Sequence, residues 1–133
     1  MAFNGIPSSE VLSVWNNVEP RIRKALDVED TGYNTEDILT SLQTRDMQLW
    51  VHPDAVAVTQ IQVLPRFKKL LLVTLGGKNM DEWVQELMDL LRLFGMDNDC
   101  KYLEQHGRKG WLKVNEKFRL GGYPAFHVMR VKL

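Results

Sequence analysis

The sequence has little that would place it among secreted, membrane-spanning or nucleic-acid-binding proteins. Its 133 residues include one cysteine, Cys100, which has no internal disulfide partner and so suits a reducing compartment. Apolar runs such as 70–73 are far too short to span a bilayer, and no charged-then-apolar leader opens the chain. Seventeen basic residues balance seventeen acidic ones, so no net charge favours nucleic acid or an anionic membrane. We therefore expect a cytoplasmic protein that meets any charged ligand locally.

The sequence also lacks the residue clusters of a metal centre or a covalent nucleophile. His52, His106 and His127 have no metal-like spacing, and no cysteine or carboxylate cluster completes a ligand set. Cys100 has no evident histidine partner, which argues against nucleophilic catalysis by its thiol. His106 and His127 are candidates for a general base, because imidazole side chains titrate near neutrality. The alternative is that each histidine is simply packed or solvated.

The first third of the chain has helical periodicity. Apolar residues recur at three- and four-residue steps over about 8–26, with Pro20 expected to kink or divide the helix. Asn34 is a suitable N-cap, and it predicts a second helix over about 35–45. Two helices therefore precede any sheet of useful size.

Strand patterns follow, and they alternate with two further helices. Short proline turns separate three apolar segments, which predicts an antiparallel meander over 47–51, 55–64 and 67–75. The remaining elements are a helix at 80–94, a strand at 100–104, a helix at 111–120 and an alternating strand at 126–133. The order ααβββαβαβ predicts one α/β (α+β) domain, residues 1–133, with a mixed sheet.

The turn between the strand at 67–75 and the following helix is the first candidate site. It contains Gly76-Gly77, and the helix that begins just beyond it has free backbone N–H groups and the positive end of its dipole at the sheet edge. Anions such as phosphates bind at such helix N-termini. The alternative is that the glycine pair only turns the chain, because a short glycine pair is weaker evidence than a full phosphate-loop motif.

Two glycine-containing pieces in this order of elements resemble the GNAT acyltransferase superfamily. Gly76-Gly77 precedes the central helix, and Gly122-Tyr123 separates the last predicted helix from the last predicted strand. The resemblance covers residues 8–133. Several short pieces look like the small GNAT-like proteins of tailed bacteriophages, namely LWV (49–51), VTQI (58–61), LGG…EW (75–83), C..LE..GRKGW (100–111), GY (122–123) and the closing VMRVKL.

This resemblance implies a splayed central strand pair that holds an acyl-CoA. The two strands would be 70–75 and 101–105, with the pantetheine arm between them and the pyrophosphate on the loop and helix start at 76–80. The implied acetyl-CoA-binding residues are Leu75, Gly76, Gly77, Lys78, Asn79, Met80 and Arg108. The usual family loop is Gln or Arg, two residues, Gly, one residue, and Gly or Ala. This chain has only residues 75–79 in its place, with fewer amides for a phosphate.

Glu104 and Tyr123 are the candidate catalytic residues. Glu104 lies on the predicted fifth strand, where a carboxylate could act as a base toward a substrate amine; the alternative is an ordinary surface carboxylate. The family usually has a tyrosine acid five residues before the aromatic of the Gly-aromatic pair, and here that position is Phe118. Phenylalanine has no proton to donate, so Tyr102 and Tyr123 are the possible substitutes.

The sequence leaves two functions open. The first is an N-acyltransferase that moves an acyl group from acetyl-CoA to an amine on a small molecule or protein. The second is a non-catalytic bacteriophage protein that uses the same fold as a virion component or as a host-directed binding module. The first would act in the host cytoplasm, and the second could act in the virion. We also expect the terminal strand at 126–133 to promote self-association or docking to another protein, because exposed strand edges attract partners.

Overall fold

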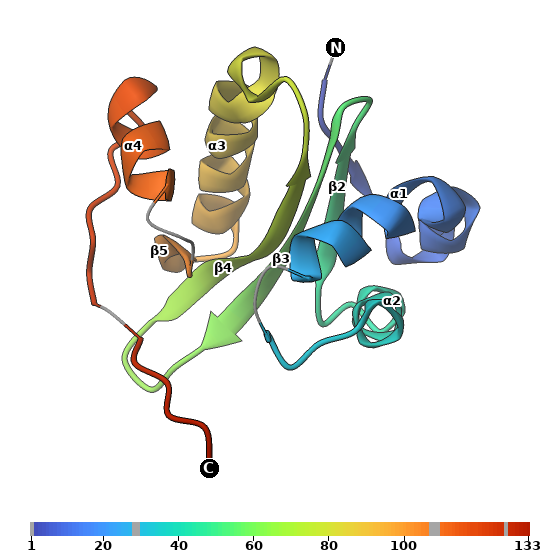
Figure 1. The fold of residues 1–133 in the computed structure, drawn as a ribbon, viewed down its shortest axis with the longest axis horizontal. Helices are drawn as coiled ribbons and strands as arrows, with labels where there is room; N and C mark the ends of the chain where they lie inside the picture. Colours follow the sequence, from blue (N-terminus) through green and yellow to red (C-terminus); the bar gives the residue numbers. More distant parts are fainter. Residues whose placement is uncertain (1, 28–29, 107–109, 127) are drawn as a thin grey trace.

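A mixed sheet of five strands forms the centre of the molecule (Figure 1). The computed structural model describes residues 2–27, 30–106, 110–126 and 128–133. Across the sheet, the strands are β1 (Asn4–Ile6), β2 (Gln48–His52), β3 (Ala55–Val63), β4 (Lys68–Gly77) and β5 (Cys100–Gln105). The pairs from β1 to β4 are antiparallel, whereas β5 runs parallel to β4 because a helix carries the chain back across the sheet. The predicted meander, crossover and mixed sheet are therefore confirmed.

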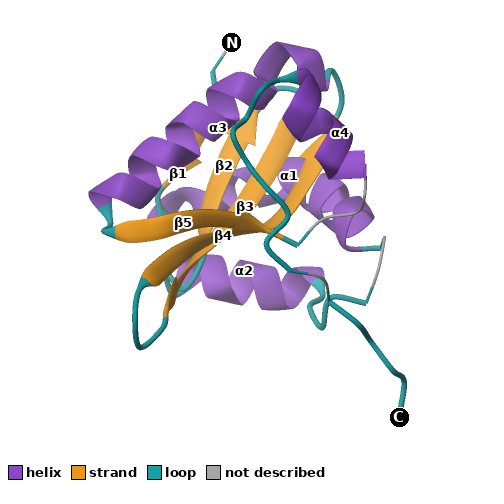
Figure 2. Cartoon of the chain, turned by 90° about the vertical axis from the view of Figure 1, so that its left-hand side faces the viewer, coloured by secondary structure: helices purple, strands orange, loops and turns teal. Residues whose placement is uncertain are grey.

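Helices cover both faces of this sheet, as Figure 2 shows from the side. The helical elements are a short 3₁₀ turn (Ser8–Glu10), α1 (Val11–Leu26), α2 (Thr35–Gln43), α3 (Met80–Asp97) and α4 (Gly110–Lys117). α1 and α2 lie on one face, and α3 and α4 lie on the other. The protein thus has three layers, helix, sheet and helix, which is the arrangement expected when both faces of a sheet are apolar.

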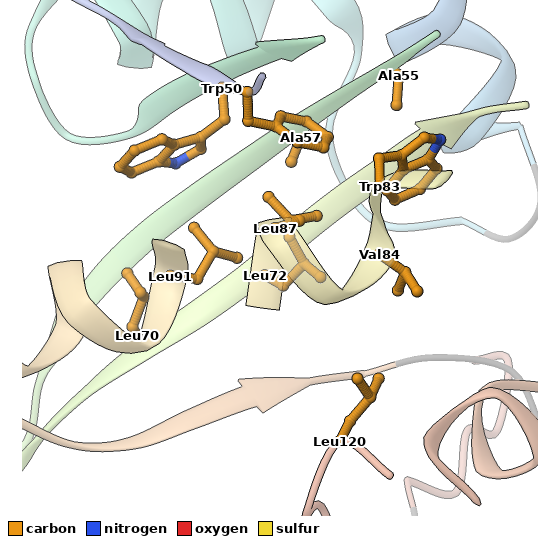
Figure 3. Packing of buried hydrophobic residues seen from close by; sticks show 11 residues of the cluster. Trp50, Ala55, Ala57, Leu70, Leu72, Trp83, Val84, Leu87, Leu91 and Leu120 are labelled. Atoms are coloured by element: carbon orange, nitrogen blue, oxygen red, sulfur yellow. The ribbon is translucent and has the colours of Figure 1, made fainter. Parts of the chain in front are cut away.

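Each interface between a helical layer and the sheet has its own hydrophobic core. The core beneath α3 contains the fully buried Trp83, Leu87 and Leu91, which pack on Leu70 and Leu72 of β4 (Figure 3). The core on the other face is built from aliphatic side chains of α1, α2, β2 and β3, with Val73 of β4 packed against it. Leu72 and Val73 show that successive side chains of β4 point to opposite faces of the sheet.

The local signals in the helical segments gave mixed results. Asn34 caps α2 as predicted: its side chain accepts a hydrogen bond from the Asp37 N–H at 2.8 Å, and the Asp37 carboxylate accepts from the Asn34 N–H at 2.9 Å. Pro20, by contrast, lies inside one continuous helix, α1, rather than dividing it into two.

The two ends of the sheet differ from the predicted order. A short N-terminal strand, β1, pairs with β2, whereas the predicted order begins with two helices. The predicted final strand at 126–133 is wrong for its described part, because Phe126 and residues 128–133 form no strand. Within the described residues β5 is therefore the last strand of the sheet. The observed order of these residues is βααβββαβα, in place of the predicted ααβββαβαβ.

Candidate functional site

β4 and β5 pair along only part of their length. Their parallel register runs from Lys68 opposite Cys100 to Leu72 opposite Gln105, where β5 ends. β4 continues for five more residues, 73–77, and pairs there only with β3 among the described strands. The outer backbone edge of 73–77 therefore has N–H and C=O groups without a strand partner, which can hydrogen-bond an extended ligand that contains amides.

A bulge in β4 lies where this unpaired edge begins. Thr59 of β3 is opposite Leu72 and Val58 is opposite Thr74, so Val73 has no residue opposite it. A bulge bends its strand and redirects the groups beside it. The bulge thus marks the point at which β4 turns away from β5.

The glycine pair at the end of β4 is explained by close packing rather than by a turn. A Cβ on Gly76 would lie 3.0 Å from the Arg21 carbonyl oxygen of α1. A Cβ on Gly77 would lie 2.4 Å from the Asp54 carbonyl oxygen, and Gly77 has a φ of 153°. Both glycines belong to β4, so they bring α1 and the β2–β3 turn close to the strand.

The loop between β4 and α3 is held by the neighbouring β2–β3 turn. The Lys78 N–H donates to the Asp54 carbonyl oxygen at 2.9 Å, and the Asn79 side-chain amide donates to the Asp54 carboxylate at 3.2 Å. The Trp83 indole N–H donates to the Lys78 carbonyl oxygen at 2.6 Å. These contacts fix the loop but use the Lys78 amide, so an anion here would meet the remaining amides of the first turn of α3.

Charges of both signs surround this end of α3. Asp81 and Glu82 lie in its first helical turn, where carboxylates stabilise the helix dipole but repel an anion. Lys117 of α4 lies 3.4 Å from Asp81, and Lys78 is exposed beside them. Leu75 and Met80 pack their side chains against the core beneath α3, so they could contact a ligand chiefly through their backbone. Lys78 is an exposed cation that lies two residues before the first residue of α3.

Glu104 lies in a three-residue polar cluster at the end of β5. Its Oε1 accepts a hydrogen bond from Lys69 Nζ at 2.9 Å and lies 2.7 Å from His106 Nε2. Glu104 is opposite Leu71, whose neighbours Leu70 and Leu72 pack beneath α3. The cluster is therefore on the other face of the sheet, the face that carries α1 and α2.

Partial burial tends to raise the pKa of Glu104, but the hydrogen bonds and charges of Lys69 and His106 outweigh this effect and hold the pKa below its ordinary value of 4.5. An ionised carboxylate can only accept hydrogen bonds, so the Nε2 of His106 must carry a proton. In a neutral imidazole the lone pair is then on Nδ1. Glu104 is thus better suited to orient His106 than to accept a proton itself.

The lowered pKa predicts a pH-dependent contribution of Glu104 to stability. A carboxylate with a lower pKa in the folded state stabilises the protein above its ordinary pKa, and this stabilisation is lost as the pH falls through the folded-state value. We expect Glu104→Gln to lower the free energy of unfolding at pH 7 and to cost progressively less below 4.5, as measured by urea denaturation. Glu116→Gln, at an exposed position of α4, is the matched control. A cost of Glu104→Gln that stays constant with pH would contradict the ionised pairing.

The other sequence candidates are not joined to this cluster. Tyr123 is 70% exposed and directly follows Gly122, whose N–H and C=O both bond the Asn115 side chain of α4 at 2.8 Å. Phe118 packs against the core beneath α3, as expected for a residue without a proton to donate. Arg108 and His127 are outside the described residues.

Sequence reasoning missed Lys69 and Asp54. Lys69 is 35 positions from Glu104, and only the parallel register of β4 and β5 brings the two together. Asp54 lies in one of the short proline turns that the sequence predicted. The proline beside it indicated the turn, but no sequence signal indicated that the turn would bond Lys78 and Asn79 between β4 and α3.

The described residues support neither a metal site nor a cysteine nucleophile. No group of three or more histidine, cysteine, aspartate or glutamate side chains is arranged there to hold a metal ion. Burial raises the pKa of the Cys100 thiol, which lowers its thiolate fraction. In the described part of the chain, no helix is both long and apolar enough to cross a membrane.

The fold matches solved acetyltransferases at very low sequence identity. No family model matches the chain, and no curated protein matches it either. A probable acetyltransferase matches with a TM-score of 0.75 at 8% identity, covering 100% of this chain and 98% of that one. An aminoglycoside acetyltransferase from an uncultured soil metagenomic sample, solved with sisomicin, matches at 0.72 with 7% identity, covering 98% and 95%. An aminoglycoside N-acetyltransferase in complex with CoA matches at 0.66 with 10% identity, covering 98% and 93%. The chain therefore has the mixed α/β fold of the GNAT acetyltransferases.

Proposed function

We propose that this single domain, residues 1–133, is an N-acyltransferase that moves an acyl group from acetyl-CoA to an amine. The observation that carries the proposal is the separation of β4 from β5 beyond Leu72 and Gln105. It leaves the outer edge of 73–77 unpaired within the described residues, next to the end of β5, which bears Glu104 and is followed directly by His106. An extended thioester with amides along its arm suits that edge, and structures of similar fold include one in complex with CoA.

The candidate acyl-donor site fits acetyl-CoA in part. The unpaired edge of 73–77 would hold the pantetheine amides, and the first amides of α3 with Lys78 would hold the pyrophosphate. Arg108 is the further cation implied by the sequence. Asp81 and Glu82 oppose the negative charge of the pyrophosphate. We therefore expect weaker binding than a glycine-rich loop without nearby carboxylates would give.

The Glu104–His106 pair supplies the base in this proposal. Glu104 holds the Nε2–H of His106, so Nδ1 can accept the proton that the amine loses as its nitrogen attacks the thioester carbonyl. The new C–N bond forms, the C–S bond breaks, and the sulfur leaves as a thiolate. Tyr123, with its exposed phenol, is the candidate that returns a proton to this thiolate. Backbone N–H groups at the bulge of β4 are candidates to stabilise the developing oxyanion.

The two faces of the sheet suggest where each substrate enters. Glu104 lies on the face with α1 and α2, whereas the N-terminus of α3 belongs to the opposite layer. An acyl-CoA bound along β4 from the α3 side would thus meet an amine that arrives from the α1–α2 side. His106 is about half exposed there, which leaves room for a bulky acceptor.

Calorimetric titration with acetyl-CoA tests this assignment. We expect measurable binding to the wild type and an affinity about tenfold lower for Lys78→Glu, since reversing one charge beside a phosphate costs about 1.4 kcal/mol or more. Arg66→Glu is the matched control, because it makes the same charge change in the β3–β4 turn, at the other end of β4. No heat of binding at millimolar acetyl-CoA, or equal effects of the two variants, would remove the acyl-donor site.

A non-catalytic binding protein is the second candidate function. The carboxylates at the start of α3 and the core position of Phe118 favour it, because both are unfavourable to the usual chemistry of this fold. In this case the protein would be a bacteriophage component of the virion or a host-directed binding module, as the sequence resemblance suggests. It would then act through protein contacts, and the same titration would give no binding of acetyl-CoA.

A further inference from the structure

A hollow of about 350 Å³ lies where the start of α1 meets the end of α2 and the first residues of β2. Figure 1 shows α2 next to the start of α1 on this side of the sheet. The floor of the hollow consists of apolar side chains that are each at most 3% exposed, namely Val11, Leu42, Met47 and Leu49. All four belong to the core on the face of the sheet that α1 and α2 cover, so the hollow reaches that core from outside. Ligand pockets occupy roughly 300–1,000 Å³, so this volume suits the apolar body of a small molecule.

The rim of this hollow is polar and carries one positive charge. Ser8 and Ser9 line it from the 3₁₀ turn, and Arg45 lines it from the connection between α2 and β2. The Arg45 Nε donates to the Ser8 Oγ at 3.3 Å, so the arginine side chain extends across to the turn. Neighbouring Asp46 accepts a hydrogen bond from the Thr44 hydroxyl at 3.1 Å, and no ion pair among the described residues includes Arg45. The exposed guanidinium thus keeps its two Nη groups for an anion.

The backbone at Arg45 is unfavourable for any residue except glycine. Arg45 directly follows Thr44, the C-cap of α2, and has a left-handed conformation with a φ of 70°. Glycine is the usual residue at this place after a helix, and a basic residue can serve there by bonding the last carbonyl groups of the helix. The side-chain hydrogen bond of Arg45 goes instead to Ser8, 37 positions away. The arginine is therefore placed to serve the hollow rather than the end of α2.

The chemistry of the rim and the floor defines the class of ligand. The planar guanidinium of an arginine matches the two oxygens of a carboxylate, and serine hydroxyl groups can donate to the same oxygens. One positive charge suits a monoanion better than a phosphate ester with two negative charges. The apolar floor would leave a polar body, such as a sugar, without hydrogen-bond partners.

We propose that this hollow binds a small monocarboxylate with an apolar body. The carboxylate pairs with Arg45 and the hydroxyl groups of the 3₁₀ turn, and the apolar body covers Val11, Leu42 and Met47. In the sheet, β3 lies between β2 and β4, so this site is separate from the unpaired edge of 73–77. The proposal does not depend on acyl transfer.

An NMR titration of the ¹⁵N-labelled full chain with sodium hexanoate at neutral pH tests the site. We expect the amides of 8–9 and 45–49 to shift together and saturate, whereas the amides of 73–77 and of the first turn of α3 stay in place. Acetate, which lacks the apolar body, and hexylamine, which has the opposite charge, should each bind at least about tenfold more weakly. No saturable shift around the hollow at millimolar hexanoate, or equal binding of hexylamine, would overturn the proposal.

Arg45→Gly separates a role in binding from a role in the fold. Glycine accepts a φ of 70° without strain, so the free energy of unfolding should stay the same or rise. The affinity for hexanoate should fall about tenfold, because the charged partner of the carboxylate is lost. Arg45→Gln, which keeps much of the side-chain length, should weaken binding by a similar factor. Arg66→Gln, in the β3–β4 turn, is the matched control and should leave the affinity unchanged. Unchanged affinity in either Arg45 variant would overturn the proposal, and so would a marked loss of stability in Arg45→Gly, since the arginine would then serve the end of α2.

Discussion

Gly77→Ala should lower the free energy of unfolding by roughly 3 kcal/mol or more, measured by urea denaturation. The added Cβ would lie 2.4 Å from the Asp54 carbonyl oxygen and 2.6 Å from the Cα of Ala55, and both are backbone atoms that cannot move aside easily. The φ of 153° adds strain for any residue with a Cβ. The substitution should therefore separate the end of β4 from the β2–β3 turn.

Gly110→Ala is the matched control for this prediction. A Cβ at Gly110 meets nothing within 4 Å, so the exchange should change stability by less than about 1 kcal/mol. Similar effects of the two substitutions would contradict the close-packing explanation of Gly77. The comparison also shows why a large residue at Gly77 is a poor probe of acetyl-CoA binding: it would disturb the fold before it blocked a ligand. The charge reversal at Lys78 is the cleaner test.

His106→Ala should reduce kcat for acyl transfer about 100-fold, assayed as thiol release from acetyl-CoA with an amine that the wild type accepts. The substitution removes Nδ1, which is the proton acceptor in the proposed chemistry, and leaves β4 and the start of α3 unchanged. Acetyl-CoA affinity should therefore be unaltered. Glu104→Gln should give a smaller loss and a changed pH profile, because the amide keeps a polar contact to Nε2 but can no longer fix the tautomer.

Two results would argue against this assignment of the base. Full activity of His106→Ala would show that another group or water accepts the proton. If His106→Ala lowered the affinity for acetyl-CoA by the same factor as kcat, His106 would act in donor binding instead. The Glu104 and His106 variants should also be compared at pH values where the wild type remains folded, so that a loss of stability is not mistaken for a loss of chemistry.

Most of the fold could be predicted because its signals are local. Asn34 indicated the start of α2 through its own capping chemistry, and the prolines at 53 and 65 separated the strands of the meander. The start of α3 at Met80 was correctly predicted, whereas Gly76 and Gly77 belong to β4 and not to the turn that the sequence predicted. Periodicity identifies an element from its own residues, so none of these predictions required knowledge of distant contacts.

The rest depended on contacts between distant parts of the chain. The ion pair of Lys69 with Glu104 requires the register of two parallel strands, and the bulge at Val73 cannot be recognised from β4 alone. The alternation at 126–133 predicted a strand, which the described residues of the segment do not form. It did not indicate a partner, and no strand pairs with the described residues of that segment. A strand needs a neighbour, which its own sequence cannot specify.

An NMR titration of the ¹⁵N-labelled protein with acetyl-CoA tests the central claim most directly, because each backbone amide reports separately. The account predicts that the amides of 73–77, the first turn of α3 and residues 105–106 shift together and saturate. Lys78→Glu should need a higher concentration to give the same shifts, and amides of the β3–β4 turn should not respond. If millimolar acetyl-CoA moves none of the amides at 73–77, the separated strands do not form an acyl-CoA site, and the protein is not the acyltransferase proposed.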